Sequence, residues 1–340
     1  MNDSLTDVAG FLVGHAAVPG PNALSGTTVV LAPPGGAVAA VAVRGGGPGT
    51  RETDALDPKN VVERIDAVVL TGGSAYGLDA AAGVMAWLEE QRRGVRVGPE
   101  PHQVVPVVPA ACLFDLGRGG NWRARPDAAV GRAAVEAAGT EIAEGNVGAG
   151  TGAVVGGLKG GVGTASVTLA SGATVAALAV VNAVGSPVDP HNGALYGEYG
   201  DTPSPQLPTP QRHLAAQARL AAARTEMPPL NTTLAVVATD ARLTRPQAQK
   251  LAGTSHDGLA RAIRPVHLMH DGDTIFALAT GSHDSGRGEA DKVLGPEELN
   301  HVLAAGADVV ARAIVRGVRA AGSVEGPGGT FPSYGDLYGS

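Results

Sequence analysis

The sequence predicts a layered α+β fold in which helices cover the outer faces of β-sheets. Short apolar runs bounded by glycine and proline are typical of buried strands, and longer segments with apolar residues on one face are typical of helices. These two kinds of segment are mixed without a strict βαβ alternation, which favours layers over a doubly wound parallel sheet. With 340 residues, 44% hydrophobic and 17% charged, the chain has ample material for a large core.

The first part of the chain alternates strands and turns. Strands are expected at Thr28–Leu31, Val38–Val43, Ala67–Leu70 and Val104–Val108. The last of these contains Pro106, which places it at a sheet edge because proline cannot donate to a neighbouring strand. A helix is expected from Leu78 to Arg93, with Gly94 closing it.

The second part contributes most of the predicted helices. Helices are expected at Asp127–Ala138, Gln211–Arg224, Arg245–Ile263 and Pro296–Ala321, and strands at Ala165–Leu169, Thr174–Val181 and Asp273–Ala279. Thr244 is a suitable N-cap for the third helix, with Pro246 in its first turn. The proline-rich segment Pro203–Pro210 is typical of a surface loop or linker.

Composition excludes several classes of protein. A net charge of −7 argues against a nucleic-acid partner or an acidic membrane surface. The single cysteine, Cys112, cannot form an intrachain disulfide. No apolar run reaches the roughly 18 residues of a membrane span, and the first residues lack the pattern of a signal peptide. We therefore expect a cytoplasmic protein with no membrane partner.

The stretch Leu230–Asp240 carries the strongest chemical hypothesis. Thr232 follows Pro228-Pro229 and stands at the head of a β-branched apolar run that is typical of a buried strand. If the Asn231–Thr232 bond were cut, Thr232 would present a hydroxyl and a free α-amine together. That amine, with an ordinary pKa of about 8, can serve as general base for its own hydroxyl. The alternative is a polar residue that merely starts a strand.

Two glycine-rich motifs suggest other chemistry. The segment 152–159 lacks the Gly-Lys-Ser/Thr ending of a phosphate-binding loop, so nucleotide binding is not favoured. Ser74, in Gly72-Gly73-Ser74-Ala75-Tyr76, resembles the nucleophile elbow of an α/β-hydrolase, but Tyr76 stands where that motif requires glycine. Ser74 could equally cap the helix that follows it.

The segment His267–Asp273 contains two imidazoles and two carboxylates within seven residues. Side chains of these types could bind a metal ion, so an uncleaved metallohydrolase that uses His267, His270 and Asp271 stays an alternative. Such a cluster is more often a solvated turn. A third interpretation is an inactive binding protein of the same fold.

Two isolated polar residues complete the candidates. Lys159 is the only ionisable side chain between Gly145 and Thr174, which suggests that it is oriented toward a partner and does not project into solvent. Asn182 follows the strand Thr174–Val181, where its amide could donate to an oxyanion or satisfy a turn.

Together these motifs resemble the self-processing β-aminopeptidase and L-aminopeptidase–D-esterase family, which includes the endo-type nylon-oligomer hydrolases. The resemblance rests on segments 44–54, 71–78, 148–152, 158–164, 181–182, 231–233 and 271–276 in the order and spacing of the family. It implies a four-layer α/β/β/α sandwich of the N-terminal-nucleophile type. It also implies a single domain, 1–340, processed into an α chain 1–231 and a β chain 232–340, and an oligomer of such heterodimers, expected to be a tetramer.

The resemblance also implies residue roles. Thr232 would be the nucleophile, Asp271 and Asp273 would orient it, Lys159 would assist it, and Asn182 would help hold the oxyanion. No cofactor or metal is needed, and the substrate would be a small peptide or amide: an α-peptide, a β-peptide or a polyamide oligomer. Phe114 stands where the family often has a tyrosine, so one hydroxyl donor is missing. The loss of one oxyanion donor can cost about 10²–10³ in rate.

Overall fold

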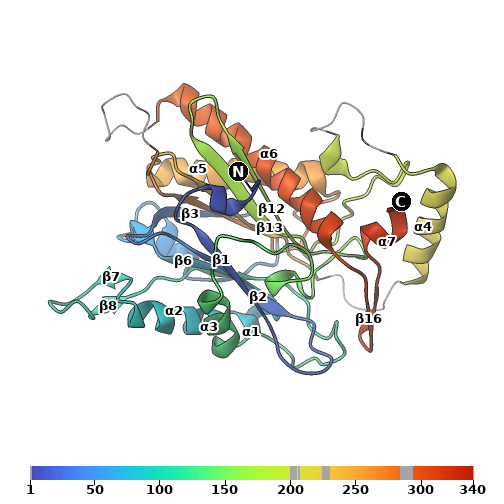
Figure 1. Ribbon diagram of the computed structural model, residues 1–340, viewed down its shortest axis with the longest axis horizontal. Helices are drawn as coiled ribbons and strands as arrows, with labels where there is room; N and C mark the ends of the chain where they lie inside the picture. Colours follow the sequence, from blue (N-terminus) through green and yellow to red (C-terminus); the bar gives the residue numbers. More distant parts are fainter. Residues whose placement is uncertain (1, 200–204, 206, 224–229, 284–293, 340) are drawn as a thin grey trace.

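Two β-sheets lie face to face between two pairs of helices in the computed structural model, which describes residues 2–199, 205, 207–223, 230–283 and 294–339 (Figure 1). The first sheet has the order β1 (Leu12–Ala17), β2 (Gly26–Leu31), β6 (Ala67–Thr71), β9 (Ala110–Cys112) and β4 (Gly49–Arg51). The second has the order β12 (Val162–Thr168), β13 (Thr174–Val180), β14 (Leu234–Thr239), β15 (Thr274–Ala279), β3 (Ala37–Val43) and β5 (Arg64–Ile65).

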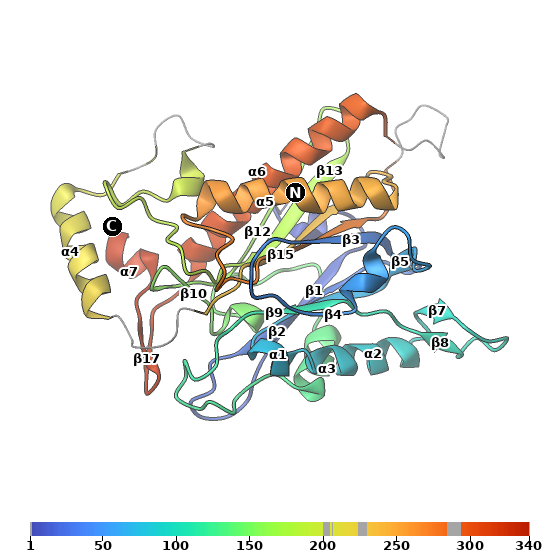
Figure 2. The ribbon, with the colours of Figure 1, turned by 180° about the vertical axis from the view of Figure 1, so that it is seen from behind.

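The outer layers are helical, which gives the four-layer α/β/β/α sandwich and confirms the predicted α+β class. Helices α2 (Ala80–Glu90) and α3 (Ala128–Glu136) cover the first sheet, and α5 (Arg245–Ala262) and α6 (Pro296–Ala320) cover the second (Figures 1 and 2). Separate apolar clusters fill the space under each helical pair and between the two sheets.

Strand β14 runs through the centre of the second sheet and is buried at all six positions. Leu234, Val236 and Ala238 pack between the two sheets, whereas Ala235 and Val237 pack under the helices. A strand with both faces covered needs apolar residues at every position, which explains why this run does not alternate with polar residues.

The order of the central strands brings four distant segments to one sheet edge. β14 pairs parallel with β15, with Leu234 opposite Thr274, and antiparallel with β13, with Leu234 opposite Val180. β12 begins opposite the end of β13, with Val162 paired to Val180. The residues just before β12, β14 and β15 and just after β13 therefore meet. These four segments contain Lys159, Thr232, Asp271, Asp273 and Asn182.

Most predicted elements are present with shifted ends. Asp127 caps α3 by accepting from Val130 N at 3.0 Å, and Thr244 caps α5 in a capping box with Gln247. The expected helix 78–93 is present as the shorter α2, and a separate one-turn helix, α1 (Ser74–Gly77), precedes it. Gly73, and not Ser74, takes the N-cap position of α1, so the capping role suggested for Ser74 is wrong.

The expected strand 104–108 is reduced to β8 (Val104–Val105), which pairs only with β7 (Val95–Arg96) because Pro106 ends the pairing. The remaining elements are α4 (Pro210–Ala222), α7 (Tyr334–Tyr338), β10 (Val154–Val155), β11 (Leu158–Lys159), β16 (Val324–Gly326), β17 (Gly329–Phe331) and four short 3₁₀ turns. Helices α4 and α7 lie side by side (Figures 1 and 2). The proline-rich segment 203–210 lies partly outside the described residues.

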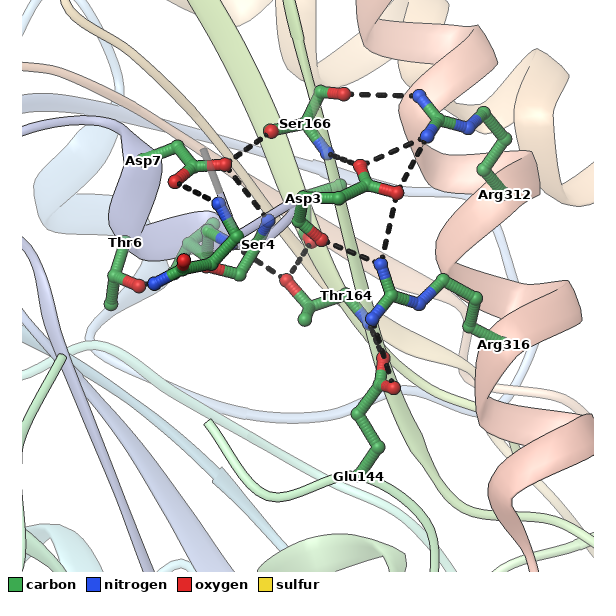
Figure 3. A network of polar contacts seen from close by, with 12 residues as sticks. Asp3, Ser4, Thr6, Asp7, Glu144, Thr164, Ser166, Arg312 and Arg316 are labelled. Atoms are coloured by element: carbon green, nitrogen blue, oxygen red, sulfur yellow. Dashed lines mark hydrogen bonds and ion pairs between the residues drawn. The ribbon is translucent and has the colours of Figure 1, made fainter. Parts of the chain in front are cut away.

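A network of polar side chains, here called the N-terminal cluster, fixes the first residues to β12 and α6 (Figure 3). It consists of Asp3, Asp7, Glu144, Thr164, Ser166, Arg312 and Arg316. None of the described helices is long and apolar enough to cross a membrane.

Candidate active site

Thr232 lies at the shared sheet edge, two residues before β14, and is only 4% exposed. Its backbone N–H donates to Asn182 O at 2.9 Å, and its Oγ1 donates to the carbonyl oxygen of Asn231 at 2.5 Å. Asn231 N in turn donates to His270 O at 3.2 Å. The hydroxyl of Thr232 is therefore held against the carbonyl group of the Asn231–Thr232 peptide bond.

A cavity of about 190 Å³ opens beside this bond. Its walls include Thr232, Asn231, Leu230, His270, Phe114, Cys112, Ser74, Ala75 and the segment 47–49. Phe114, which stands where the family often has a tyrosine, also lines this cavity. A Cβ on Gly272 would lie 2.8 Å from Thr232 Oγ1 and 2.7 Å from Gly47 O, so only glycine fits there.

Asp273 is fully buried, and its two carboxylate oxygens bind Thr233 and His267 respectively. Its Oδ1 accepts from Thr233 N at 2.9 Å, and its Oδ2 accepts from the backbone N–H of His267 at 3.1 Å and pairs with His267 Nδ1 at 2.8 Å. Asp273 therefore fixes the residue next to Thr232. The sequence suggested His267 only as a metal ligand of the alternative metallohydrolase, so its contact with Asp273 is a new element of the site.

Asp271 is also fully buried and lies on the same turn. Its Oδ1 accepts from Val184 N at 3.2 Å, and its Oδ2 has no hydrogen-bond partner within the described part of the chain. Burial, together with the nearby charge of Asp273, raises the pKa of the Asp271 carboxyl. An acceptor oxygen without a partner in a buried position is available to another group.

Lys159 is fully buried, as its isolation among apolar residues suggested. Its Nζ donates to Gly150 O at 2.8 Å and to Gly160 O at 2.7 Å. Burial and the positive charge of Arg118 lower the pKa of Lys159 to about 7. A lysine with this pKa can gain or lose a proton near neutral pH.

Arg118 was not recognised from the sequence, although it is the side chain that connects the site. Its Nη1 donates to Asn182 Oδ1 at 2.6 Å and to Gly152 O at 2.7 Å, and its Nη2 donates to Asn231 Oδ1 at 2.6 Å. Asn182 Nδ2 lies 3.5 Å from Phe114 O. Arg118 thus holds the side chains of both Asn182 and the residue before the proposed cleavage point.

Asp115, also missed, is a second buried acid in this region. Its Oδ1 accepts from Gly73 N at 2.7 Å, and the Ser25 hydroxyl lies close to the same carboxyl group. Burial raises the pKa of Asp115 to about 6, against the opposing effects of the Gly73 hydrogen bond and the charge of Arg118. Asp115, Arg118 and Lys159 form one electrostatically coupled group.

The residues of the metal-site and nucleophile-elbow alternatives lie close to Thr232 or to its cavity. His267 is paired with Asp273, His270 faces the cavity, and across the described ranges no group of three or more His, Cys, Asp or Glu side chains is placed to hold a metal ion. Ser74 follows β6 with a positive φ of 52° and faces the same cavity as Thr232. The positive φ reproduces part of the geometry of a nucleophile elbow, but no basic side chain among the described residues forms a hydrogen bond with the Ser74 hydroxyl.

Comparison with solved structures identifies the class of fold. The chain superposes on a β-aminopeptidase of a Burkholderia species with a TM-score of 0.73, at 24% identity and over 99% of this chain and 92% of that one. It superposes on the L-aminopeptidase D-Ala-esterase/amidase of Ochrobactrum anthropi with a TM-score of 0.71, at 22% identity and over 99% and 95% of the two chains. The latter is described as a variant of the Ntn hydrolase fold, and this chain has that fold.

Sequence comparison identifies the family. The model of peptidase family S58 matches residues 3–331. An uncharacterized aminopeptidase of Mycobacterium tuberculosis is 49% identical over 99% of this chain and 98% of its own length. A 6-aminohexanoate-oligomer endohydrolase of a Kocuria species is 32% identical over 76% of this chain and 70% of its own. The chain belongs to peptidase family S58 and is a hydrolase of amide bonds.

Proposed function

We propose that this chain is an N-terminal-nucleophile amidase that cuts its own Asn231–Thr232 bond and then hydrolyses peptide or amide substrates through Thr232. The observation that carries the proposal is the position of Thr232 Oγ1, buried beside a cavity and 2.5 Å from the carbonyl oxygen of Asn231. A nucleophile held this close to a carbonyl group needs little further ordering to react.

In the self-cleavage step, Thr232 Oγ1 loses its proton to a base and attacks the carbonyl carbon of Asn231. The C–N bond breaks, the nitrogen of Thr232 takes up a proton, and Asn231 becomes an ester on Oγ1. Water then attacks the ester, which releases a carboxylate on Asn231 and restores the hydroxyl. The free amine is absent before the cut, so another group must act as base. Lys159, which precedes β12 at the same sheet edge as Thr232 and has a pKa of about 7, is our candidate.

In turnover, the new α-amine of Thr232 takes the proton from Oγ1 as the hydroxyl attacks the substrate carbonyl. The substrate amine leaves with that proton, and water hydrolyses the acyl-enzyme. The position of Thr232 N, 2.9 Å from Asn182 O, would orient the amine. Asp271, with a free buried oxygen, would orient the ammonium form, and Asp273 would keep Thr233 in place.

The oxyanion would be held by the Asn182 side chain and backbone N–H groups. Arg118 binds Asn182 Oδ1, which leaves the Nδ2 end of the amide as a donor toward the cavity side, where it lies 3.5 Å from Phe114 O. Because Phe114 has no hydroxyl group, the site has one donor fewer than a tyrosine would give, and we expect correspondingly slower turnover.

The substrate class is proposed from the relatives and from the contacts of Asn231. The relative that is 49% identical over almost the full length is named as an aminopeptidase, which favours substrates with a free amino terminus. In the uncut chain the N–H of Asn231 donates to His270 O, and a substrate α-amine could use the same acceptor. A processed form of chains 1–231 and 232–340, assembled as a homo-oligomer of such heterodimers, is part of the same proposal.

The test is a set of variants at the cleavage point. Thr232→Ala removes the hydroxyl and should remain one uncut chain without amidase activity, whereas Thr232→Ser should still process. Thr233→Ala is the matched control and should process, because its backbone N–H to Asp273 is kept. Denaturing gels and intact masses are the measurements. Cleavage of Thr232→Ala, or a block in Thr233→Ala alone, would show that the nucleophile is misassigned.

A further inference from the structure

We propose that Arg118 is a specificity-determining residue that recognises the acyl residue of the substrate by a hydrogen bond. It would select amides whose acyl residue carries an acceptor oxygen on its γ-carbon, as asparaginyl and aspartyl groups do. This inference rests on the proposed function, since it treats the Asn231–Thr232 bond as the first substrate of the enzyme.

The contact that supports it is short and partly buried. Arg118 Nη2 donates to Asn231 Oδ1 at 2.6 Å, and Arg118 is only 6% exposed. The guanidinium group has donors and no acceptor, so the amide of Asn231 must face it with the oxygen and not the nitrogen. The other hydrogen bonds of this side chain end on Gly152 O, Asn182 Oδ1 and Leu230 O, the last at 3.5 Å.

The position of Asn231 in the uncut chain marks the acyl subsite. Self-cleavage and turnover use the same oxygen, Thr232 Oγ1, and therefore require their carbonyl carbons at the same place. After the cut, Asn231 must withdraw before a substrate can enter. The acyl residue of that substrate then occupies the position that Asn231 held, with its side chain directed at Arg118 Nη2.

A substrate that leaves this donor unsatisfied is penalised. Arg118 is buried, and burial lowers the pKa of its guanidinium group to about 10, which reflects the cost of removing the charge from water. If the acyl residue offers no acceptor, this charged donor loses its 2.6 Å hydrogen bond and keeps only the long contact with Leu230 O at 3.5 Å. Leucine has the shape of asparagine and no acceptor, so it is the sharpest comparison.

There is also room for an acyl group at this position. Asn231 lines the 190 Å³ cavity beside Thr232 and a second cavity of about 590 Å³ formed by residues that include Ser186, Leu220 and Phe331. Withdrawal of Asn231 would therefore leave a space that opens on both sides. Size alone should not exclude a leucyl group. A difference in rate between leucyl and asparaginyl substrates would therefore report on the hydrogen bond to Arg118.

The test compares matched anilides of asparagine, aspartate and leucine on the processed wild-type protein. We expect kcat/KM for the asparaginyl and aspartyl anilides to exceed that for the leucyl anilide by roughly tenfold to a hundredfold, the range for a hydrogen bond from a charged donor. In Arg118→Gln this ratio should fall toward one, and Arg118→Lys should restore part of it. The ratio is independent of the amount of active enzyme.

Variants of the cleavage point give a second measurement that does not depend on Arg118 substitutions. Asn231→Asp keeps the acceptor and should process at close to the wild-type rate, whereas Asn231→Leu should process at least about tenfold more slowly. Equal rates for the leucyl and asparaginyl anilides, or normal processing of Asn231→Leu, would overturn the inference and leave the amidase intact. An uncut wild-type chain that hydrolyses no anilide would instead overturn the proposed function, and this inference with it.

Discussion

The N-terminal cluster and the candidate active site are both networks of charged residues, but they differ in how completely their charges are paired. In the N-terminal cluster, Arg312 Nη2 lies 2.9 and 2.8 Å from the two carboxylate oxygens of Asp3 (Figure 3). Arg316 donates to Glu144 Oε2 at 3.0 Å. These side chains keep contact with solvent: 30% of Arg312 and 43% of Asp3 are exposed.

In the candidate active site the charged side chains are buried and less completely paired. Lys159, Asp271 and Asp273 are fully buried, and Lys159 donates to backbone carbonyls and not to a carboxylate. One oxygen of Asp271 has no hydrogen-bond partner among the described residues. The pKa of Lys159 is lowered to about 7 and that of Asp115 raised to about 6, in both cases chiefly by burial.

The comparison separates structural charges from chemical ones. Half-exposed charges that pair with each other cost little to hold and stabilise the fold modestly. Buried charges with incomplete partners cost stability, and such groups gather where a fold needs groups that exchange protons. The two clusters should therefore respond to substitution in opposite ways, with activity sensitive in one and stability in the other.

The largest difference is expected when one cation is removed from each cluster. Lys159→Met should lower amide hydrolysis by about 10²–10³ and slow self-cleavage, because a group that moves protons is lost. Its Tm should change little, because two lost hydrogen bonds are offset by removal of a buried charge. Arg312→Met, the matched control, should process and turn over normally. Thermal melting gives the Tm and initial rates give the activity of both variants. Normal activity in Lys159→Met would show that Lys159 has no catalytic role.

A smaller effect is expected from the acid beside the strand edge. Asp273→Asn keeps an acceptor for Thr233 N but removes a negative charge near the amine of Thr232. The carboxylate favours the ammonium form, so its removal should lower the amine pKa and move the acidic limb of the pH–rate profile to lower pH. Turnover should fall about tenfold, since the pairing with His267 is also weakened. Asp3→Asn is the control, and an unshifted profile in Asp273→Asn would show that this turn has only a structural role.

The pH dependence of stability provides a third, finer comparison. The folded-state pKa of Lys159 is about 7, against its ordinary value of 10.5, so between these values the unfolded chain binds the extra proton. The free energy of unfolding should therefore rise with pH across this window, and the cost of charging Lys159 should be fully present below pH 7. Denaturant unfolding in the uncut Thr232→Ala background can measure this slope. The slope should flatten when Lys159→Met is added, and an unchanged slope would assign it to other groups.

The sequence located the groups that flank strands and missed those that depend on long-range packing. Thr232, Asp271, Asp273 and Asn182 stand next to long apolar runs, so the strands could be predicted. The parallel pairing of β14 with β15 and the antiparallel pairing of β13 with β14 bring these residues together. Arg118 could not be assigned in this way. Its contact with Asn231 spans 113 residues and begins in a loop with no periodic pattern.

His267 was missed for a different reason. It adopts a positive φ of 60° and places its backbone N–H and its Nδ1 on the same carboxylate oxygen of Asp273. The sequence motif showed the two residues together but not this turn, because non-glycine residues seldom adopt that conformation. The metal-site alternative arose from the same residue types, and only the geometry shows that His267 is already bound to Asp273.

The smallest effect is expected from the N-terminal cluster itself. Asp3→Asn removes the carboxylate that pairs with Arg312 and Arg316 but keeps an acceptor for Ser166 N. Because these side chains are partly exposed, the free energy of unfolding should fall by about 1 kcal/mol or less. The loss should shrink further in high salt, because salt screens exposed charges. Unfolding curves at low and high salt in the uncut Thr232→Ala background measure this effect, with Asp3→Asn in the wild-type chain retaining full processing and turnover. A large, salt-independent loss, or slower processing, would show that this cluster is coupled to the active site and that the separation drawn here between structural and chemical charges does not hold.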